Sequence, residues 1–456
     1  MFCYYLMPII FIIGILAIAF EDVIKVNKAA TAVAMSIILW LLFILNAEQF
    51  LMLNPPQHVK EFFALFPQYR DMPLDELAFA FVEHKLVVGL GDVATTLFFV
   101  LGSMAIIDII DSHGGFGIIS QAIRTNVQRK LLWILSFITF FMSVLLGNIA
   151  TVIVMIAIAR KLIPERNIRL LFSSMIIIAA NAGGSWSPIG DVTTLLLWTG
   201  GNISALHQIT SLFLPALVML LVPLSITTFM LPKGGVVEPL AADEHNTAVS
   251  DKMRRRVLYV GLGSLALVPV LQTLIELPPF MGVLLGLVAL WFITDRRYAD
   301  SEDERLQELR VHRSFSRVDI STVFFFLGIL LSVQALIVAG QLTIMANILS
   351  DTFADKNMIA LVLGVCSSFL DNVALVSATM GMYPVEAAGI FASDSSFWTF
   401  LAYCAVTGGS ILIIGSASGV TVMGMEKISF GYYLKRFTLP VLLGYAAGAA
   451  LYLLIF

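Results

Sequence analysis

The chain has 456 residues, of which 59% are hydrophobic and 13% charged, with 27 Lys and Arg against 31 Asp and Glu. A soluble globular domain does not contain such a high fraction of apolar residues. Because apolar runs of about 18 residues or more also recur along the chain, the sequence indicates a polytopic helical membrane protein. The sequence lacks the short alternating segments of an outer-membrane barrel, a basic tail for nucleic acid, and the GxxxxGK[ST] motif of an ATP-driven transporter.

The N-terminal stretch MFCYYLMPIIFIIG has no basic region and no small-residue cleavage site, so it predicts a retained first helix and not a signal peptide. Plain membrane crossings are predicted near residues 6–20, 29–46, 93–110, 211–231, 257–275, 280–294, 319–339 and 437–456. Residues 47–92, which contain Asn54-Pro55-Pro56, predict a loop outside the membrane with one or two short amphipathic helices. Four further apolar stretches carry polar interruptions, at 131–163, 170–198, 358–383 and 398–425.

Charge indicates how these segments cross. If 131–163 and 358–383 each enter the membrane and return to the same side, one face carries 23 of the 27 Lys and Arg residues. Under the positive-inside rule this face is cytoplasmic, which places both termini outside the cell, with the chain in the inner membrane. The two arms of the 131–163 segment, about 25 and 16 Å long as helix, are too short for two full crossings. A single long tilted helix is the alternative for this segment.

The two unusual regions repeat. GGSWSPIGD begins at Gly183 and GGSILIIGS begins at Gly408, an offset of 225, while GNIATVIV and DNVALVSA place Asn148 and Asn372 at an offset of 224. The matched spacing predicts an internal duplication, and the opposite sidedness of the two hairpins is typical of inverted-repeat secondary transporters. The predicted fold is therefore an all-α membrane protein of two inverted five-helix repeats, each with a re-entrant hairpin and a broken transmembrane helix. The repeats are expected at 1–231 and 257–456, joined by a cytoplasmic linker at 232–256. Close helix packing alone is the other explanation of the glycines.

Polar groups at membrane depth mark the candidate site, because ionisable residues there are costly to keep. Asp191 follows the first break, Asp371-Asn372 lies at the tip of the second hairpin, and Gly147-Asn148 lies at the tip of the first. Asp92, Asp108 and Asp111 flank the third crossing, where a helix end in solvent (Asp108, Asp111) or an N-cap (Asp92) is an equally good explanation. Asp191 could itself be a helix cap, worth about 1 kcal/mol, although its repeat partner is Ser416.

The expected ligand follows from the atoms available. Carboxylate, amide and hydroxyl oxygens, with the carbonyls of an unwound stretch at 181–190, suit a small hard cation such as Na⁺ or Li⁺, and the region offers no thiolate or imidazole for a softer metal. The half-helix before the break is expected to end at Asn181. No Lys or Arg lies inside the interrupted segments away from their ends, which argues against an anion. A carboxylate that binds either a cation or a proton predicts exchange of one for the other, with no resident cofactor and no enzymatic activity.

The stretches NAGGSWSPIGDVTTLLLW, SSFLDNVALVSA and GGSILIIGSASG, together with FFVLGSMAIIDIIDSHGGF at 98–116, resemble the NhaD-type sodium/proton antiporter family of the ion-transporter superfamily. The resemblance runs from about 93 to 436 and implies a homodimer with elevator-type movement of the hairpins and broken helices. Matched residue by residue, it implies ion-site roles for Asn148, Asn181, Asp191, Thr193, Thr194, Ser367, Asp371 and Asn372. To these the repeat adds Ser410 and Ser416, and the third crossing adds Asp92 and Asp108; Na⁺ itself is expected at Asp191, Asn148, Asn181 and Asn372.

The sequence departs from this family at the first hairpin tip, which reads Gly147-Asn148 where Asp-Asn is expected, and in the acids of the third crossing, which are Asp and not Glu. The alternative function is a sodium-coupled symporter of a carboxylate or another anion, which shares the hairpins and broken helices but does not need Asp191 and Asp371. A membrane enzyme or sensor would need a catalytic constellation, and the six histidines lie mostly in loops.

Overall fold

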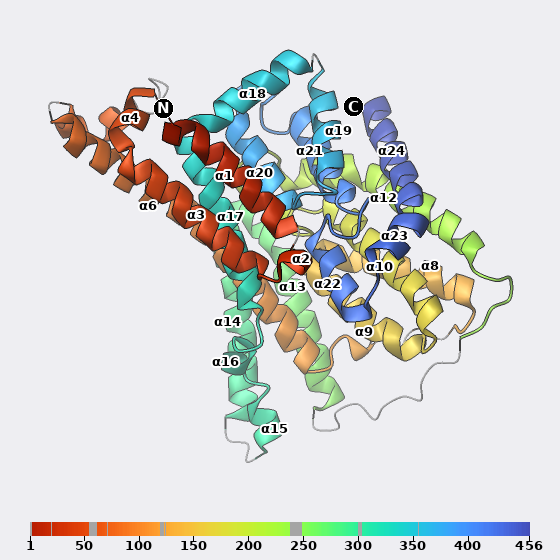
Figure 1. Ribbon diagram of the computed structural model, residues 1–456. Coiled ribbons are helices and arrows are strands. Elements are labelled where there is room, and N and C mark those ends of the chain that lie inside the picture. The colour runs from red at the N-terminus through yellow and green to blue at the C-terminus, as the bar shows by residue number, and fades with distance from the viewer. Residues whose placement is uncertain are drawn as a thin grey trace. The chain divides into compact units, whose positions relative to one another are not determined.

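The computed structural model describes residues 2–19, 21–53, 62–70, 72–118, 123, 125–237, 249–299, 303–353 and 355–456. The described residues form helices and no strands, and nine of these helices are long and apolar enough to cross a membrane (Figure 1). The chain divides into two compact units, Met1–Leu97 with Asp319–Ile359 and Val373–Val385, and Phe98–Val318 with Ala360–Asn372 and Glu386–Phe456. We call them the first and the second unit. The prediction of an all-α membrane protein is confirmed.

The first unit is built around α3 (Lys28–Leu45), which packs against α17 (Ile320–Val338) and α1 (Phe2–Ala19). Gly328 of α17 lies against the backbone of Ala32, where a side chain would not fit, so the two helices approach closely. The indole Nε1 of Trp40 donates to the carbonyl of Leu331, at 3.0 Å. The other elements of this unit are α2 (Glu21–Ile24), α4 (Ala47–Leu53), the 3₁₀ turn η1 (Pro67–Tyr69), the first part of α6 (Leu74–Ser112), α18 (Gln341–Thr352) and most of α20 (Asn372–Met382).

The structure corrects the prediction for residues 47–92. Helix α6 begins at Leu74, not near residue 93, and its 39 residues span about 58 Å, nearly twice the thickness of a bilayer core. The polar residues between 75 and 85 lowered the local hydropathy, but they are compatible with a helix whose first turns lie outside the hydrocarbon. The short helix α4 agrees with the prediction, whereas Asn54-Pro55-Pro56 lies outside the described residues, as does much of the predicted 232–256 linker.

The second unit holds both broken helices and the first hairpin. The hairpin consists of α8 (Gln128–Leu146) and α9 (Asn148–Leu162), which pack against each other and against α10, so the single tilted helix is excluded. The first broken helix is α10 (Arg166–Ser185) with α11 (Val192–Thr199), and the second is α21 (Ser396–Gly408) with α22 (Ala417–Glu426). The remaining elements are α12 (Ala205–Met230), α13 (Asp251–Ile275), α14 (Pro279–Tyr298), α15 (Glu304–Gln307), α16 (Val311–Ser314), most of α19 (Lys356–Cys366), α23 (Phe430–Arg436) and α24 (Thr438–Ile455).

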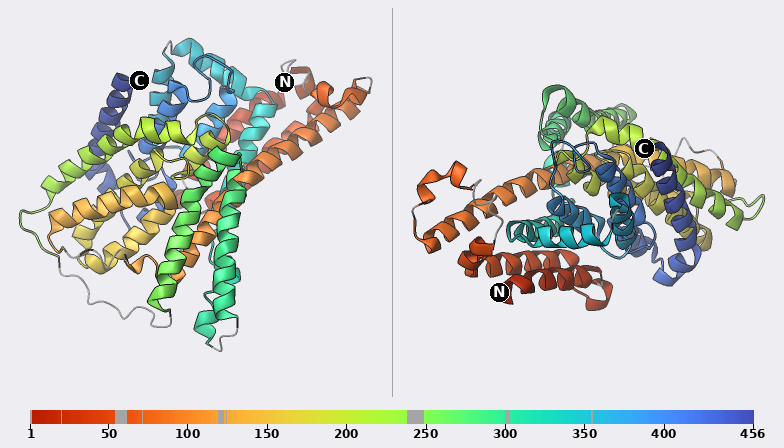
Figure 2. Two further views of the ribbon diagram at one scale, coloured as in Figure 1. Left: turned by 180° about the vertical axis from the view of Figure 1, so that it is seen from behind. Right: turned by 90° about the horizontal axis from the view of Figure 1, so that it is seen from above.

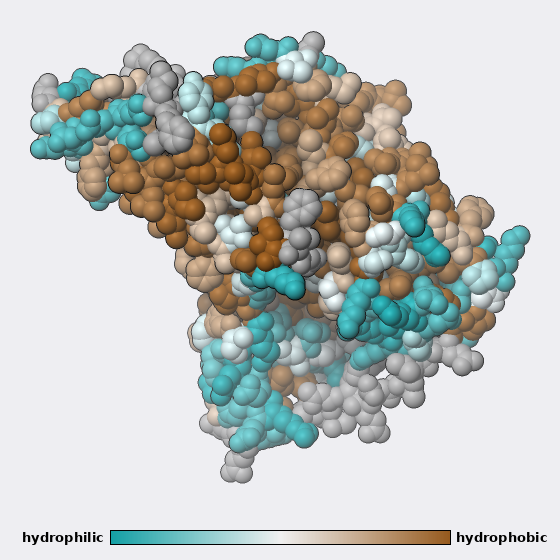
Figure 3. Space-filling model, in the orientation of Figure 1, coloured by the Kyte–Doolittle hydropathy of each residue, from teal (hydrophilic) through white to brown (hydrophobic). Residues whose placement is uncertain are grey.

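Helix α10 is the core of the second unit. It is buried along most of its length and contacts α8, α9, α12, α21 and α22. Helices α12 and α24 pack side by side (Figure 2). Hydrophobic side chains cover the outer face of α24, while hydrophilic ones gather around α15 and α16 (Figure 3). This pattern is typical of a helix bundle whose long sides face lipid and whose helix ends face water.

Contacts recur at the offset that the sequence repeat predicts. Ser143 donates from its hydroxyl to the carbonyl of Ala180, at 2.6 Å, and Ser367 donates in the same way to Ala405, at 2.7 Å. Gly183 lies against the carbonyl of Phe140, as Gly408 does against that of Gly364, too closely for any side chain. Each residue in the first copy of a contact lies 224 or 225 positions before its counterpart in the second copy. These matched contacts support the predicted duplication, and the inversion of the two copies stays a prediction.

Candidate functional site

The first break lies between α10 and α11, at residues 186–191. Asp191 caps α11, because its Oδ1 accepts a hydrogen bond from the backbone N–H of Thr193, at 2.7 Å. The hydroxyl of Thr194 lies 3.2 Å from the backbone N–H of Asp191 and closes the cap from the other side. The capping role considered for Asp191 is therefore real, and it also fixes where the carboxylate points.

The break begins later than predicted. Helix α10 continues through Asn181 to Ser185, so Asn181 lies within the helix and contributes its side chain, not a free carbonyl. Glycine inside a helix is unfavourable by about 1 kcal/mol. Here Gly183 and Gly184 let neighbouring backbone approach, since the carbonyl of Phe140 lies against Gly183 and that of Gly190 would lie 2.5 Å from a Cβ on Gly184. Packing of this kind keeps the helix wound where the sequence alone favours a break.

The hairpin tip brings a second polar side chain to Asp191. Gly147 joins α8 to α9 with a φ of +75°, a conformation that favours glycine, and Asn148 is the first residue of α9. The backbone N–H of Asn148 donates to the carbonyl of Gly190, at 3.0 Å. Its side-chain amide donates to Oδ2 of Asp191 and, at 3.0 Å, to Oδ1 of Asn181. The tip is thus tied to the end of the break, at Gly190 and Asp191, and to Asn181 inside α10.

The second broken helix contributes three serine hydroxyls. The amide of Asn181 donates to the hydroxyls of Ser410, at 2.9 Å, and Ser416, at 3.0 Å. Ser418 donates back to Oδ1 of Asn181, at 2.7 Å. Ser416 also caps α22 by accepting from the backbone N–H of Gly419, just as Asp191 caps α11. Ser418 was not predicted from the sequence, although its spacing of two from Ser416 in GSASG is a signal that points to it.

From the segment predicted as the second hairpin, Asn372 at the start of α20 donates from its amide to Oδ1 of Asp191 at 3.4 Å. Asp371, the residue before it, lies close enough to Asp191 for the two carboxylates to interact electrostatically. The structure therefore brings together most of the predicted site residues, from the first hairpin, the start of α20 and both broken helices: Asn148, Asn181, Asp191, Thr193, Thr194, Asp371, Asn372, Ser410 and Ser416.

Three other candidates lie elsewhere. Ser367 is buried and its hydroxyl bonds the carbonyl of Ala405, so it serves helix packing. Asp108 forms an ion pair with Arg317 at 2.9 Å near the end of α6, where it also contacts Ser112. Asp92 lies in the middle of α6 in the first unit with an exposed side chain, so it is not the N-cap considered above.

The cluster is buried. Asp191 is 4% exposed, Asn148 5% and Asn181 fully buried. Every hydrogen bond described above to the Asp191 carboxylate comes from a neutral group. The hydroxyl of Thr193 is fully buried beside this carboxylate. Among the described residues no three His, Cys, Asp or Glu side chains gather as metal ligands. The arrangement suits one monovalent cation or one proton at a single carboxylate.

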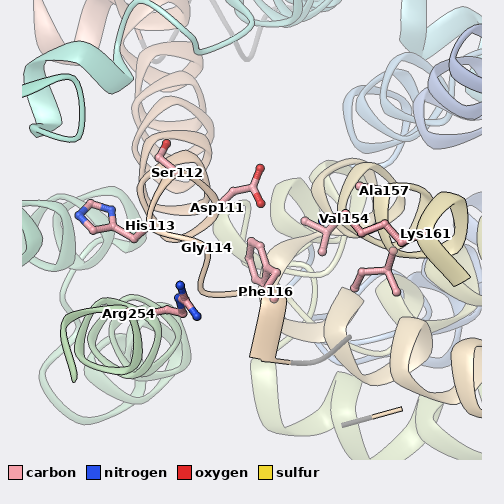
Figure 4. A pocket seen from close by; sticks show the side chains of 11 residues that line it. Asp111, Ser112, His113, Gly114, Phe116, Val154, Ala157, Lys161 and Arg254 are labelled. Atoms are coloured by element: carbon pink, nitrogen blue, oxygen red, sulfur yellow. The ribbon is translucent and has the colours of Figure 1, made fainter. Parts of the chain in front are cut away.

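A separate cavity of about 280 Å³ lies where α6 ends. Asp111 and the turn after α6 form one wall, and Val154, Ala157 and Lys161 of α9 form the other (Figure 4). Arg254 of α13 also lines it. Burial lowers the pKa of His113 in this turn, and its ring lies 5.7 Å from that of Tyr298. None of the residues that line this cavity belongs to the cluster around Asp191, so the two sites are separate.

The fold and the cluster together define a polytopic membrane transporter with a buried polar site formed by hairpin tips and broken helices. A family model described as "Citrate transporter" matches residues 5–398. "Sodium/proton antiporter 1" of Arabidopsis thaliana is 41% identical over 98% of this chain and 72% of its own length, and "Sodium/proton antiporter 2" of the same plant is 38% identical over 98% of both. "Na(+)/H(+) antiporter NhaD" of Alkalimonas amylolytica is 30% identical over 84% of this chain and 80% of its own.

The chain therefore belongs to the citrate transporter family and to the NhaD-type sodium/proton antiporter family, and the second assignment confirms what the motifs predicted. The fold is also similar to a solved structure, the YdaH transporter of Alcanivorax borkumensis, described as having an unusual topology. The match has a TM-score of 0.51 at 14% identity and covers 82% of this chain and 88% of that one.

Proposed function

We propose that the protein exchanges Na⁺ or Li⁺ for H⁺ across the inner membrane. The observation that supports this most directly is the Asp191 carboxylate, which is buried and bonded by the neutral amides of Asn148 and Asn372. A cation and a proton compete for such a carboxylate, because each neutralises the same charge. The names of the plant and bacterial relatives agree with this chemistry.

Exchange needs the site to open to each side in turn. We propose an elevator-type movement in a homodimer, with two inverted repeats at 1–231 and 257–456 and both termini external. The matched contacts of Ser143 and Ser367 support the duplication. The sidedness is tested by labelling single cysteines at the exposed positions Arg166 and Ala388 in a variant without native cysteines. We expect the cysteine at position 166 to be labelled from the cytoplasm and the cysteine at position 388 from outside. The reverse accessibility contradicts the inverted topology.

The exchange itself is tested in everted vesicles from a host without its own antiporters. A ΔpH set by respiration is monitored by a quenched dye, and Na⁺, Li⁺ and K⁺ are added in turn. We expect dequenching with Na⁺ or Li⁺ for the wild type and none for Asp191→Asn, which keeps the size of the side chain but not its charge. Asp108→Asn is the matched control, since that carboxylate is held by Arg317. If the wild type shows no cation-dependent dequenching between pH 6 and 9, the proposal is contradicted.

The description of the matched family favours one second candidate, sodium-coupled uptake of citrate or another carboxylate. Such a substrate carries two or three negative charges and needs donors that balance them. The described cluster instead presents the carboxylate of Asp191, with Asp371 nearby, and amide or hydroxyl partners. Sodium-dependent accumulation of labelled citrate in right-side-out vesicles, in place of ΔpH dissipation, distinguishes the two functions.

A further inference from the structure

The carbonyl of Ser410 is held by a side chain from outside the cation cluster. Tyr433 of α23 is fully buried, and its hydroxyl donates to this carbonyl at 2.7 Å. Ser410 comes just after α21 ends, and its own hydroxyl accepts from the amide of Asn181, at 2.9 Å. A continuous chain of contacts thus leads from Tyr433 through Ser410, Asn181 and Asn148 to Asp191.

The first repeat has the same contact at the same place. Gln208 of α12 is also fully buried, and its amide donates to the carbonyl of Ser185, at 3.1 Å. Gln208 and Tyr433 are 225 residues apart, and so are Ser185 and Ser410. The amide oxygen of Gln208 has no partner among the described residues, so the bond to Ser185 is the one contact described for this buried amide.

The helices that carry the two donors begin alike. Ser204 caps α12 and Ser429 caps α23, again 225 residues apart, and each accepts a hydrogen bond from the backbone N–H three residues later. The donors are therefore delivered to the two breaks by equivalent structures. The residue types differ, an amide in one copy and a phenol in the other, while the accepting carbonyl is the same. What the duplication preserves is the bond and not the side chain.

The ends of broken helices need such donors. The last carbonyls of a helix have no partner within it, and in a dry interior an unpaired carbonyl is costly. A donor on a neighbouring helix removes that cost in one orientation of the peptide only. For Ser410 this orientation is the one in which the hydroxyl faces Asn181. For Ser185 it fixes the entry to residues 186–191, at whose end Asp191 lies.

We infer that Tyr433 and Gln208 are a pair of positioning residues for the cation site, each of which holds the carbonyl at the end of one broken helix. The inference rests on the proposed function of that site. Neither residue touches the cation. Tyr433 acts through the hydroxyl of Ser410 on Asn181, and Gln208 acts on the backbone that carries Asp191. The alternative is that both side chains satisfy buried carbonyls for stability alone.

The two roles differ in what they change. A residue that only stabilises the fold alters the amount of working carrier, and hence the maximal rate, but not the cation concentration at half-maximal rate. A positioning residue alters that concentration. Tyr433→Phe removes one hydroxyl, and Gln208→Met keeps an unbranched side chain without a donor. Loss of one buried hydrogen bond is expected to raise the Na⁺ concentration at half-maximal rate roughly three- to tenfold at fixed pH.

Two matched controls are available. Tyr452→Phe removes a phenol hydroxyl from an equally buried ring whose bond, at 3.2 Å, goes to the carbonyl of Ser396 at the far end of α21. Gln272→Met removes an amide that accepts from the indole of Trp198, at 2.9 Å, near the end of α11. Both controls are expected to keep the half-saturating Na⁺ of the wild type, even where their maximal rates fall.

Half-saturation is measured from dequenching in everted vesicles and, independently, from the Na⁺ dependence of the melting temperature of the purified protein. If the half-saturating Na⁺ concentration rises for both Tyr433→Phe and Gln208→Met and stays unchanged in both controls, the paired positioning role is supported. If the wild type exchanges Na⁺ and either variant matches its control, the paired role is overturned and the proposed function stands. If Na⁺ neither drives exchange by the wild type nor raises its melting temperature, the proposed function and this inference both fail.

Discussion

Asn148, the first residue after the tip of the first hairpin, donates a hydrogen bond from its side-chain amide to the carboxylate of Asp191. The two residues are 43 positions apart in the sequence and both are buried. The contact joins an element that enters the membrane and turns back to an element that is broken inside it. A hydrogen bond to a charged group is stronger than one between neutral groups, so this amide stabilises the ionised form of Asp191.

Asn148→Ala tests that contact. Without the amide donor, the buried carboxylate is less stable in its charged form, so a proton displaces the cation more easily. We expect half-saturating Na⁺ at fixed pH to rise about tenfold, corresponding to about 1.4 kcal/mol. Ser136→Ala is the control, because Ser136 lies buried on the same hairpin and its hydroxyl has no described partner. Equal half-saturation for the two variants would show that Asn148 does not support cation binding.

Competition at one carboxylate also predicts a pH dependence with a definite sign. Where Asp191 is mostly protonated, each rise of one pH unit lowers the proton concentration tenfold. If one proton leaves for each cation that binds, the Na⁺ concentration at half-maximal rate then falls about tenfold per pH unit. Once the carboxylate is ionised, half-saturation becomes independent of pH. Dequenching titrations from pH 6 to 9 measure the slope, and Asp111→Asn, outside the cluster, should leave it unchanged. A half-saturating concentration that rises with pH, or that stays constant down to the lowest pH at which the protein remains folded, would rule out a shared site.

The sequence predicted which residues form the cluster better than it predicted how those residues are arranged. Glycine, proline and polar residues at membrane depth are costly, so their positions in the sequence located the first hairpin, both breaks and the turn between α19 and α20. The offset between GGSWSPIGD and GGSILIIGS then related the two copies. The register of the first break was wrong, because Asn181, Gly183 and Gly184 were interpreted as breaking residues. Tight packing of Gly183 and Gly184 against neighbouring backbone, which no local pattern reveals, keeps this stretch helical.

Long-range partners account for what the sequence did not predict. Ser418 bonds Asn181 across 237 residues, and nothing near either residue indicates the other. The length of α6 was missed because the polar residues near its start resemble a loop on a hydropathy scale. Asp108 was a candidate for the site because acids near membranes are rare, yet Arg317, which satisfies it, lies 209 residues away. Hydropathy finds costly groups but does not say which partner offsets the cost.

Gly147→Asp tests why the first hairpin tip reads Gly-Asn where the family resemblance leads us to expect Asp-Asn. Gly147 has φ +75° and ψ 160°, and a non-glycine residue there is strained by about 1–3 kcal/mol. Space is not the obstacle, since the nearest atoms to an added Cβ, the carbonyl oxygens of Ile189 and Gly190, are 3.8 and 3.9 Å away. We expect the midpoint of thermal unfolding in detergent to fall by about 1–4 °C.

Two companion variants separate strain from charge. Gly147→Ala should lower the midpoint as much as Gly147→Asp, because both adopt the same backbone conformation. Gly424→Ala, in α22 with no atom within 4 Å of the added Cβ, should leave the midpoint unchanged or raise it. A midpoint for Gly147→Asp equal to that of the wild type would mean that the first tip tolerates an acid, and that the glycine is no conformational requirement.

Glu426, the last residue of α22, ties three helices of the second unit together. Its side chain is 2% exposed and lies 2.6 Å from Nε of Arg160 in α9 and 2.9 Å from Nε of Arg169 in α10. Glu426→Gln removes the charge but keeps the shape, and leaves Arg169, which is 17% exposed, without its counter-ion. Breaking a buried pair in this way costs about 3 kcal/mol, so the melting temperature should fall by several degrees.

The surface pair of Glu308 and Arg313 is the matched control for this prediction. The two charges are 3.5 Å apart and both side chains are more than half exposed, so Glu308→Gln should change stability by less than about 1 kcal/mol. Salt distinguishes the two pairs further, because exposed charges are screened within about 3 Å at 1 M ionic strength and buried charges are screened much less. The loss caused by Glu426→Gln should therefore persist in 1 M salt. Equal effects of the two variants, or an effect of Glu426→Gln that disappears in salt, would mean that burial does not set the strength of the contact between α9, α10 and α22.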